Sequence, residues 1–425
     1  MKRYLKCLTA LLLCLTMLSV AGCGKKETKN NEFKPSLDTD AKVVINVSGF
    51  FGNFEALDQV TNDFNQFYPN VEFSYEQLSV ENFESYMEAN PGVDIVMTSE
   101  EVFDKYGDNL KECFVDLSKE DINLSDIRED MLKRGYHDGK LLSVPMGQNI
   151  YGIVVNETLL EKEGLSVPGN YEEFLNALSV LKDKGYVPIQ GPTSKVYAEL
   201  TQGMAYDMIM NDKNLYNDLI AGKDSAADKL QTVYDKLDTL INSGYIDNEV
   251  NKTYPSDNYD KAILKFFEGN VPFWVCNTEK VSGMKKRESK SEAFQANPFK
   301  YTYIYSPLGD NGVYAYTEPW FGFSVNKNSD DYDYAVEFMR FMSTKDEINK
   351  MASIKGIPSV AINNTDADIY KNVINPEKTE MNCVNDGTIS SGMISNWYTC
   401  VNKYISGEFK TGKDALRQFV SLSKK

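Results

Sequence analysis

The chain has very little histidine and a deficit of positive charge. Its 425 residues include one histidine, His137, and acidic residues outnumber basic ones by 62 to 45, a formal net charge of −17. A single histidine excludes His-rich zinc sites, and it is the one candidate for the histidine of a catalytic triad. So negative a surface repels phosphate backbones, and we expect no nucleic-acid partner. The G-x-S-x-G and H-E-x-x-H patterns are missing too, so we expect no enzyme activity, no metal and no cofactor.

Long apolar runs are also missing beyond the N-terminus, where no stretch reaches the eighteen residues typical of a membrane span. Three basic residues, Lys2, Arg3 and Lys6, precede an apolar run from Leu8 to Val20, which is short for a membrane span and typical of a signal peptide. The run ends in Val20-Ala21-Gly22-Cys23, which resembles the lipobox of bacterial lipoproteins. The resemblance implies that residues 1–22 are removed, that Cys23 is lipidated and that 23–41 form a flexible tether. We therefore expect a lipid-anchored protein on the extracellular face of the cell membrane; the alternative is a plain secretory signal with an incidental cysteine.

The cysteines do not form a disulfide pattern. Of the seven, Cys7 and Cys14 lie in the predicted signal peptide and Cys23 at the lipobox, which leaves four that are widely spaced. Four cysteines allow three pairings, and buried free thiols are an equal alternative. The four whose state stays open are Cys113, Cys276, Cys383 and Cys400.

Hydrophobic periodicity alternates between two and about 3.6 residues along the chain. Period two predicts strands over 43–47, 71–75, 93–97, 151–155, 271–276 and 321–325. Helical spacing predicts helices beginning near Leu57 and over 171–184, 226–243, 333–343 and 414–420, two of which end at Gly185 and Gly244. Strands alternating with helices of this length indicate an α/β protein with mostly parallel sheets.

Several short motifs follow one another in a fixed order. They are Pro91–Val96, Phe114–Leu117, Asp138–Pro145 with Tyr151–Asn156, Phe267–Phe273, Ala335–Met342 and Gly356–Pro358. Each is weak alone, but the ordered set resembles that of the extracellular solute-binding proteins, family 1, which serve carbohydrate ABC importers. The resemblance covers residues 42–422. Two positions depart from it: Thr98 stands where many relatives have an aromatic residue, and Asn277-Thr278-Glu279 stands in place of G-x-W.

This resemblance implies a two-lobed periplasmic-binding-protein-like fold of type II, with a hinge and a ligand cleft between the lobes. It places 42–148 plus 277–320 in lobe one and 149–276 plus 321–425 in lobe two. The implied function is a non-catalytic, monomeric receptor that binds a mono- or oligosaccharide and delivers it to the permease of an ABC transporter. Two alternatives stay open, namely the same fold binding a polyamine or other small cation, and a membrane-anchored carbohydrate hydrolase.

A sugar site needs aromatic faces for C–H groups and planar polar groups for hydroxyls. The aromatic candidates are Trp320 and Trp397, and relatives place a Trp-Tyr pair where this chain has Trp397 and Tyr398. Polar candidates follow from the rule that loops at the carboxyl ends of parallel strands face the crevice. The expected ligand-binding residues are therefore Trp397, Trp320, Tyr398, Glu101, Ser99, Thr98, Gln148, Asn149, Phe51 and Glu318. Alternatively, the tryptophans pack in a core, and the polar residues cap or begin the next helix.

Overall fold

The computed structural model describes residues 33–424, except 255–258, 363, 365–367 and 375–378. The predicted signal peptide and the lipidated Cys23 lie outside these residues. The chain divides into Met1–Ser36 and a compact unit, Leu37–Lys425, with which the following description is concerned. No helix in the described part of the chain is long and apolar enough to cross a bilayer.

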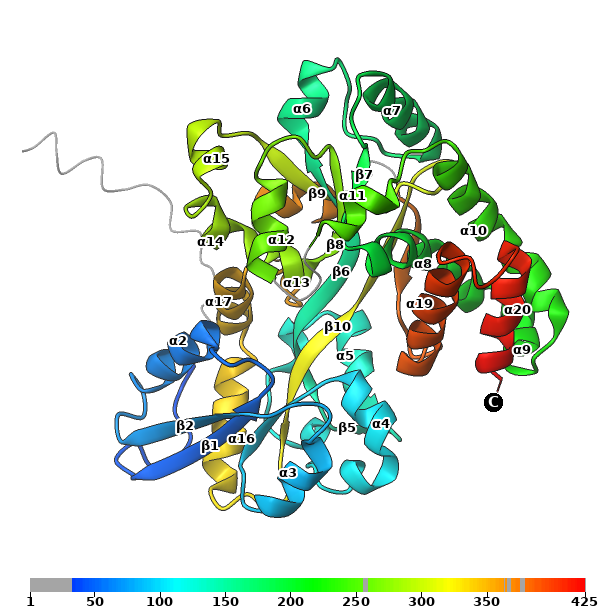
Figure 1. The fold of residues 1–425 in the computed structure, drawn as a ribbon. Coiled ribbons are helices and arrows are strands. Elements are labelled where there is room, and N and C mark those ends of the chain that lie inside the picture. Colours follow the sequence, from blue (N-terminus) through cyan, green and yellow to red (C-terminus); the bar gives the residue numbers. More distant parts are fainter. Residues whose placement is uncertain (1–32, 255–258, 363, 365–367, 375–378, 425) are drawn as a thin grey trace, which may run out of the picture. The chain divides into compact units, whose positions relative to one another are not determined.

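The N-terminal part of the unit is a small parallel sheet. Strand β1 (Val43–Gly49) lies between β2 (Val71–Gln77) and β3 (Ile95–Thr98) and is parallel to both. The helices α2 (Glu55–Phe64), α3 (Phe83–Ala89) and α4 (Glu100–Lys111) follow these strands in turn. Two later helices, α16 (Tyr332–Met342) and α17 (Lys345–Lys355), pack onto the same part of the unit (Figure 1).

Buried Asp94 ties the later segment to this sheet. Its carboxylate accepts hydrogen bonds from the backbone N–H of Asn46 at 2.7 Å and from the Ser329 hydroxyl at 2.6 Å. The N–H of Asp331, just before α16, donates to it as well at 3.2 Å. A buried carboxylate requires such donors, because its desolvation would otherwise be costly.

Two long strands run through the middle of the unit. The first half of β6 (Val144–Asn156) is antiparallel to β10 (Val313–Val325), with Glu318 opposite Asn149. The far end of β10 is antiparallel to β3, and the second half of β6 pairs with β8 (Phe273–Asn277) and β9 (Tyr301–Tyr305). The strand order is therefore β2-β1-β3-β10-β6-β8-β7, with β7 at Ile189–Gln190.

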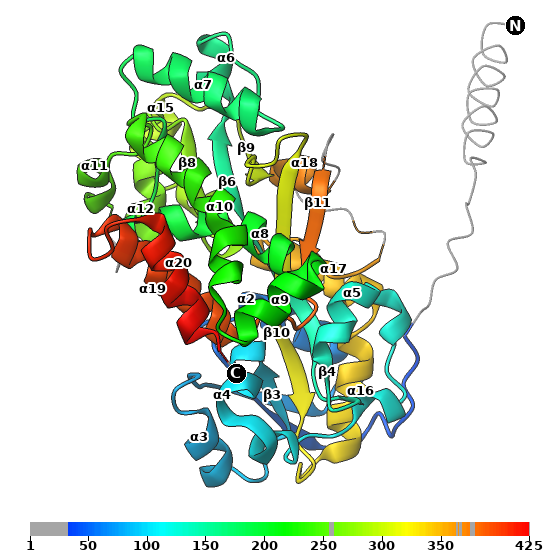
Figure 2. The same cartoon turned by 90° about the vertical axis from the view of Figure 1, so that its right-hand side faces the viewer.

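The C-terminal part of the unit is mainly helical. The helices α7 (Tyr171–Asp183), α8 (Thr193–Asn211), α10 (Asp224–Asn242), α19 (Ser391–Ile405) and α20 (Gly412–Leu422) surround one core (Figure 2). In α10, Leu230, Val233, Leu237 and Leu240 are fully buried, as their three- and four-residue spacing requires. The glycines Gly185 and Gly244 end α7 and α10 with φ of 86° and 66°, a conformation that favours glycine.

Shorter elements complete the unit. They are β4 (Tyr136–His137), β5 (Lys140–Leu141), β11 (Thr379–Val384), α5 (Glu129–Leu132), α6 (Glu157–Lys162), α9 (Lys213–Ile220), α11 (Asn248–Lys252), α12 (Tyr259–Phe266), α13 (Thr278–Val281), α14 (Met284–Glu288), α15 (Glu292–Ala296) and α18 (Lys371–Ile374), together with four single-turn 3₁₀ helices. Cys113, Cys276 and Cys400 are free thiols, and the side chain of Cys383 lies outside the described part.

The helices and strands expected from periodicity are confirmed, but the expectation of mostly parallel sheets is wrong. Parallel pairs occur at β1–β2, β1–β3, β7–β8 and β10–β11, whereas β6 and β10 make antiparallel pairs with one another and with β3, β8 and β9. The period of an isolated strand carries no information on the direction of its neighbour, and the long strands return through the sheet rather than crossing over a helix.

The strand pairings also group segments differently from the expected lobes. Strand β9, expected with 42–148, pairs with residues 152–156, and α16, expected with 149–276, packs beside β1. The reason is the direction of β10, which carries the chain back to the β1–β3 end instead of away from it. The lobe boundaries stay a prediction. The pairings favour moving β9 to the lobe of residues 152–156 and α16 to the lobe of β1.

Candidate functional site

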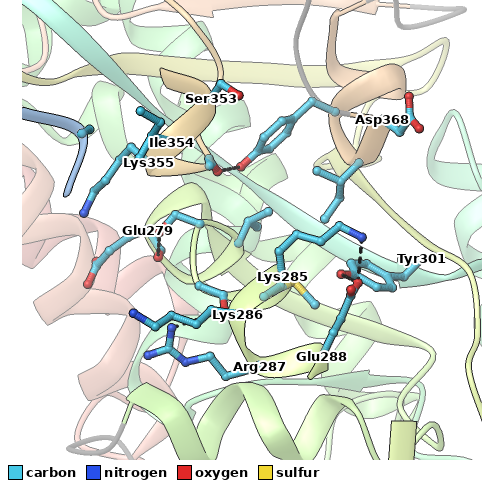
Figure 3. Close-up of a pocket in the computed structure, with 18 of the residues that line it drawn as sticks. Glu279, Lys285, Lys286, Arg287, Glu288, Tyr301, Ser353, Ile354, Lys355 and Asp368 are labelled. Atoms are coloured by element: carbon cyan, nitrogen blue, oxygen red, sulfur yellow. Dashed lines mark hydrogen bonds and ion pairs between the residues drawn. The ribbon is translucent and has the colours of Figure 1, made fainter. Parts of the chain in front are cut away.

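A cavity of about 1130 Å³ opens beside the strands β9 and β10. Its lining comes from the loop after β1, from α13 and α14, from β9 and β10, from the end of α17 and from residues 368–371. Figure 3 shows charged side chains from several of these elements extending into it. The volume is at the upper end for small-molecule sites and suits an oligomeric ligand.

One wall of the cavity is aromatic. Phe51, in the loop after β1, and Trp320 lie edge to face with ring centroids 5.4 Å apart, and both are half-buried. The register of β10 against β6 shifts between Pro319 and Phe321, so Trp320 has no opposite residue. Such an irregularity re-aims a side chain out of the pleat, and Pro319 has no N–H to continue the ladder. The structure thus brings together two of the expected site residues.

A lysine covers this aromatic wall. The Lys355 ammonium lies 3.7 Å from the ring centroid of Phe51, 5.1 Å from Trp320 and 5.9 Å from Phe54. Lys355 is the last residue of α17, and Gly356 follows in the left-handed conformation with φ of 72°. Burial lowers the pKa of Lys355, partly offset by the charges of Glu279 and Glu55. The arrangement is a cation–π contact to three rings, of which Phe51 is the nearest.

Most other charges at the cavity are paired. Lys285 contacts Glu288 at 2.9 Å, and Tyr301 of β9 also donates a hydrogen bond to Glu288 (Figure 3). The remaining pairs are Lys286 with Glu55 at 3.5 Å, Glu279 with Lys280 at 3.0 Å, Lys371 with Glu157 at 3.0 Å, and Arg287 with Asp260.

A second group of polar residues surrounds Glu318, which is half-buried on β10. Its two carboxylate oxygens accept hydrogen bonds from Tyr151 at 2.8 Å and from Tyr316 at 2.7 Å. Burial raises the pKa of Glu318, against the lowering effect of both tyrosines and of Arg134. The pKa of Tyr398 is raised well above 10 by burial, and its neighbours include Glu318 and Glu199. Glu318 and Tyr398 thus act on one another electrostatically, and neither lines the cavity.

Gln148 and Asn149 are buried in the hinge strand β6. Gln148 donates to the carbonyl of Ser359 at 2.9 Å and accepts from the Thr317 hydroxyl at 3.1 Å. Asn149 accepts from the Thr278 hydroxyl at 2.8 Å. These bonds connect β6 with three later segments of the chain, so both amides stabilise the strand crossings in this structure.

Thr98 and Ser99 lie elsewhere, at a small pocket of about 20 Å³ that Trp320 also lines. The Thr98 hydroxyl is fully buried and bonds to the hydroxyls of Ser143 and Ser324, each at 2.8 Å. Ser99 is the N-cap of α4, and Glu101 is exposed in its first turn. The expected carboxylate at this position therefore faces solvent, as first-turn acids often do.

Trp397 is fully buried in the C-terminal core. Its ring packs against Phe419 at 5.3 Å, Tyr234 at 5.8 Å and Tyr206 at 6.3 Å. Its assignment to the ligand stays a prediction that this packing does not favour. Among the described residues, no cluster of three or more His, Cys, Asp or Glu side chains suits a metal.

Sequence reasoning missed most of the cavity lining, including Lys355, the wall residue Tyr301 and the charged residue Glu279. A lysine in the last turn of a helix is the ordinary preference of the helix dipole, so Lys355 carried no distinguishing signal. The available hint was its place directly before the Gly356–Pro358 motif. The G-x-W departure at 277–279 was the corresponding hint for Glu279.

Solved structures show the class of this fold. The chain is similar to raffinose-bound RafE at 16% identity and a TM-score of 0.68; the match covers 90% of this chain and 100% of RafE. The ligand-free RafE of Streptococcus pneumoniae is similar with a TM-score of 0.70 at 16% identity; the match covers 90% of this chain and 98% of RafE. A sugar transporter of Bacillus licheniformis in complex with stachyose is similar with a TM-score of 0.63 at 17% identity; the match covers 89% of this chain and 98% of the transporter chain. The predicted two-lobed α/β fold of solute-binding proteins is thereby confirmed.

The family follows from the sequence comparison. The family model described as bacterial extracellular solute-binding protein matches residues 59–375, which is most of the chain. The chain therefore belongs to the bacterial extracellular solute-binding protein family, as the ordered motifs predicted. No curated protein sequence matches it.

Proposed function

We propose that this protein is a lipid-anchored extracellular receptor that binds a mono- or oligosaccharide between two lobes and delivers it to an ABC importer. The observation that carries the proposal is the cavity of about 1130 Å³, walled by Phe51 and Trp320 in a solute-binding fold. Flat aromatic rings beside charged planar groups are what a sugar requires, because each pyranose has an apolar face and a polar rim.

The relatives support a sugar as the cargo. RafE binds raffinose, the Bacillus licheniformis protein binds stachyose, and an ABC-transporter binding protein from Bifidobacterium animalis binds mannobiose. We infer a sugar cargo for this chain because it shares their fold and belongs to a solute-binding family. The residues of its site are assigned from its own structure. Of the expected residues, Phe51 and Trp320 contact the ligand in this proposal, while Gln148, Asn149 and Glu318 support the crossings behind them.

The lobes in this proposal follow the strand pairings. Residues 42–144 and 322–361 form one lobe, and 150–317 with 369–424 form the other, joined where β6 pairs with β10. Closure about these paired strands changes the space between the lobes and the surface that a permease contacts.

The sugar proposal is tested with the soluble mature chain, residues 24–425, which contains the whole compact unit. Thermal shift and tryptophan fluorescence would be measured against neutral and acidic oligosaccharides, spermidine, and Fe³⁺. A ligand at about 100 times its dissociation constant stabilises the folded state by about 2.7 kcal/mol, a shift of several degrees. Stabilisation by one glycan series without breakdown is the expected result. Stabilisation by spermidine alone, or release of shorter sugars, would overturn the proposal.

The lipid anchor is tested separately, because its basis is the sequence around Cys23 alone. Full-length chain expressed in a Gram-positive host with an alkyne fatty acid should take up label, and Cys23→Ser should abolish it. The variant should then be found in the medium or retain its signal peptide. Cys113→Ser, at a half-buried free thiol, is the matched control and should label as the wild type does. Equal labelling of the Cys23→Ser variant would contradict the anchor.

A further inference from the structure

The cation on the aromatic wall distinguishes this cavity. Lys355 is half-buried, with its ammonium 3.7 Å from the centroid of Phe51 and 5.1 Å from that of Trp320. In the part of the chain that the structure describes, no carboxylate lies within 4 Å of this ammonium and no hydrogen bond is made to it. Its direct contacts are therefore ring faces, and the carboxylates of Glu279 and Glu55 act on it only from beyond ion-pair distance.

The cavity's acids do not neutralise it. Glu55 pairs with Lys286, Glu279 with Lys280 and Glu288 with Lys285. Glu157 pairs with Lys371, and Asp368, the other acid that lines the cavity among the described residues, is exposed, as is Lys300. The unmatched charge in the half-buried part of the cavity is thus positive, on a protein whose net charge is −17.

The same geometry disfavours two other kinds of cargo. A cationic ligand would need the ring faces that the Lys355 ammonium already occupies, and it would meet a like charge there. A neutral sugar gains no charge pair from Lys355, and stacking on the face of Phe51 that the ammonium covers would require its displacement. An anionic group, by contrast, gains a charge-assisted hydrogen bond to Lys355 without disturbing the ring contacts.

We infer that the cargo is an acidic glycan, whose carboxylate or sulfate group pairs with Lys355 while Phe51 and Trp320 hold that lysine in place. This inference rests on the proposed sugar-receptor function and names its substrate class. The two rings hold the ammonium in one position. Lys355 is then the residue that distinguishes acidic from neutral glycans.

Calorimetric titration of the 24–425 chain provides the test. The acidic probes are trigalacturonic acid, an alginate trisaccharide, a glucuronoxylotriose and a sulfated galactose disaccharide. The neutral probes are fully methyl-esterified trigalacturonic acid, raffinose, stachyose and mannobiose. We expect one acidic series to bind, its neutral counterpart to bind at least about tenfold more weakly, and affinity to fall as salt rises. Carboxylate and sulfate probes separate the two sources of the anion.

Variants assign the effect to the residue. Lys355→Met should weaken binding of the acidic glycan about 10- to 100-fold and remove most of the salt dependence, because a charge-assisted hydrogen bond is lost. Lys355→Arg should retain most of the affinity. Lys213→Met, which removes an exposed lysine at the start of α9 that does not line the cavity, is the matched control and should change affinity by less than about twofold. Unchanged melting temperatures would show that each variant is folded.

The outcomes separate this inference from the function it rests on. Neutral glycans that bind the wild type more tightly than acidic ones, with Lys355→Met without effect, would overturn the inference and leave the sugar receptor standing. Failure of every glycan to bind would overturn both.

Discussion

Two charged groups near the middle of β10 have different surroundings: Glu318 belongs to the strand, and Lys355, at the end of α17, lies over Trp320 of the same strand. The Glu318 carboxylate accepts hydrogen bonds from Tyr151 and Tyr316, so its burial is compensated within the chain. The Lys355 ammonium rests on Phe51 and Trp320 with no anion beside it among the described residues. A group whose partners are all internal stabilises the fold, whereas a group held in place but unpaired is available to a ligand.

The comparison predicts its largest effect at Glu318. Glu318→Leu should lower the free energy of unfolding by about 3 kcal/mol, because it leaves two buried tyrosine hydroxyls without their acceptor. Glu318→Gln, which keeps one oxygen acceptor, should cost about 1 kcal/mol. Urea denaturation followed by circular dichroism measures both. A Glu318→Leu protein as stable as the wild type would show that the cluster does not support the fold.

A smaller effect is expected at the aromatic wall. Trp320→Ala should weaken binding of the glycan cargo about tenfold, or about 1.4 kcal/mol, because it removes one of the rings that hold Lys355. Titration calorimetry measures the change. Tyr136→Ala, at an exposed aromatic residue of β4 away from the cavity, is the control and should bind as the wild type does. Equal affinities for the Trp320→Ala and wild-type proteins would remove the aromatic wall from the site.

The smallest expected effect is on the pH dependence of stability, and its sign differs between the two groups. Burial raises the pKa of Glu318 above 4.5, so between 4.5 and the raised value the folded state keeps a proton that the unfolded chain has lost. Wild-type stability relative to Glu318→Gln should therefore fall as pH rises through this interval. Burial lowers the pKa of Lys355 below 10.5, so the unfolded chain keeps the proton longer. Wild-type stability relative to Lys355→Met should accordingly rise as pH increases toward 10.5.

Both slopes come from denaturation midpoints measured across pH for each wild-type and variant pair. Slopes of the same sign would mean that one of the two groups is not desolvated as the structure places it.

Local patterns predicted the elements well, because each depends on residues near one another in the chain. The spacing of Leu230, Val233, Leu237 and Leu240 predicted one buried face of α10, and Gly185 and Gly244 predicted where two helices end. The ordered motifs predicted the family, which the match over 59–375 confirms. The direction of the strands and the grouping of β9 and α16 were not predictable, since pairing depends on residues far apart in sequence.

For the candidate site, too, local sequence predicted some features and only long-range packing set the others. By itself the sequence determined the fold class, the family and the presence of aromatic residues suited to sugars, because composition and motif order carry that information. Only the tertiary structure decided which of them meet. It buried Trp397 in a core, left Glu101 in solvent and brought Phe51, Trp320 and Lys355 together from three segments. The reason is physical: whether a side chain faces a core, a cavity or water is set by long-range packing, which no local pattern records.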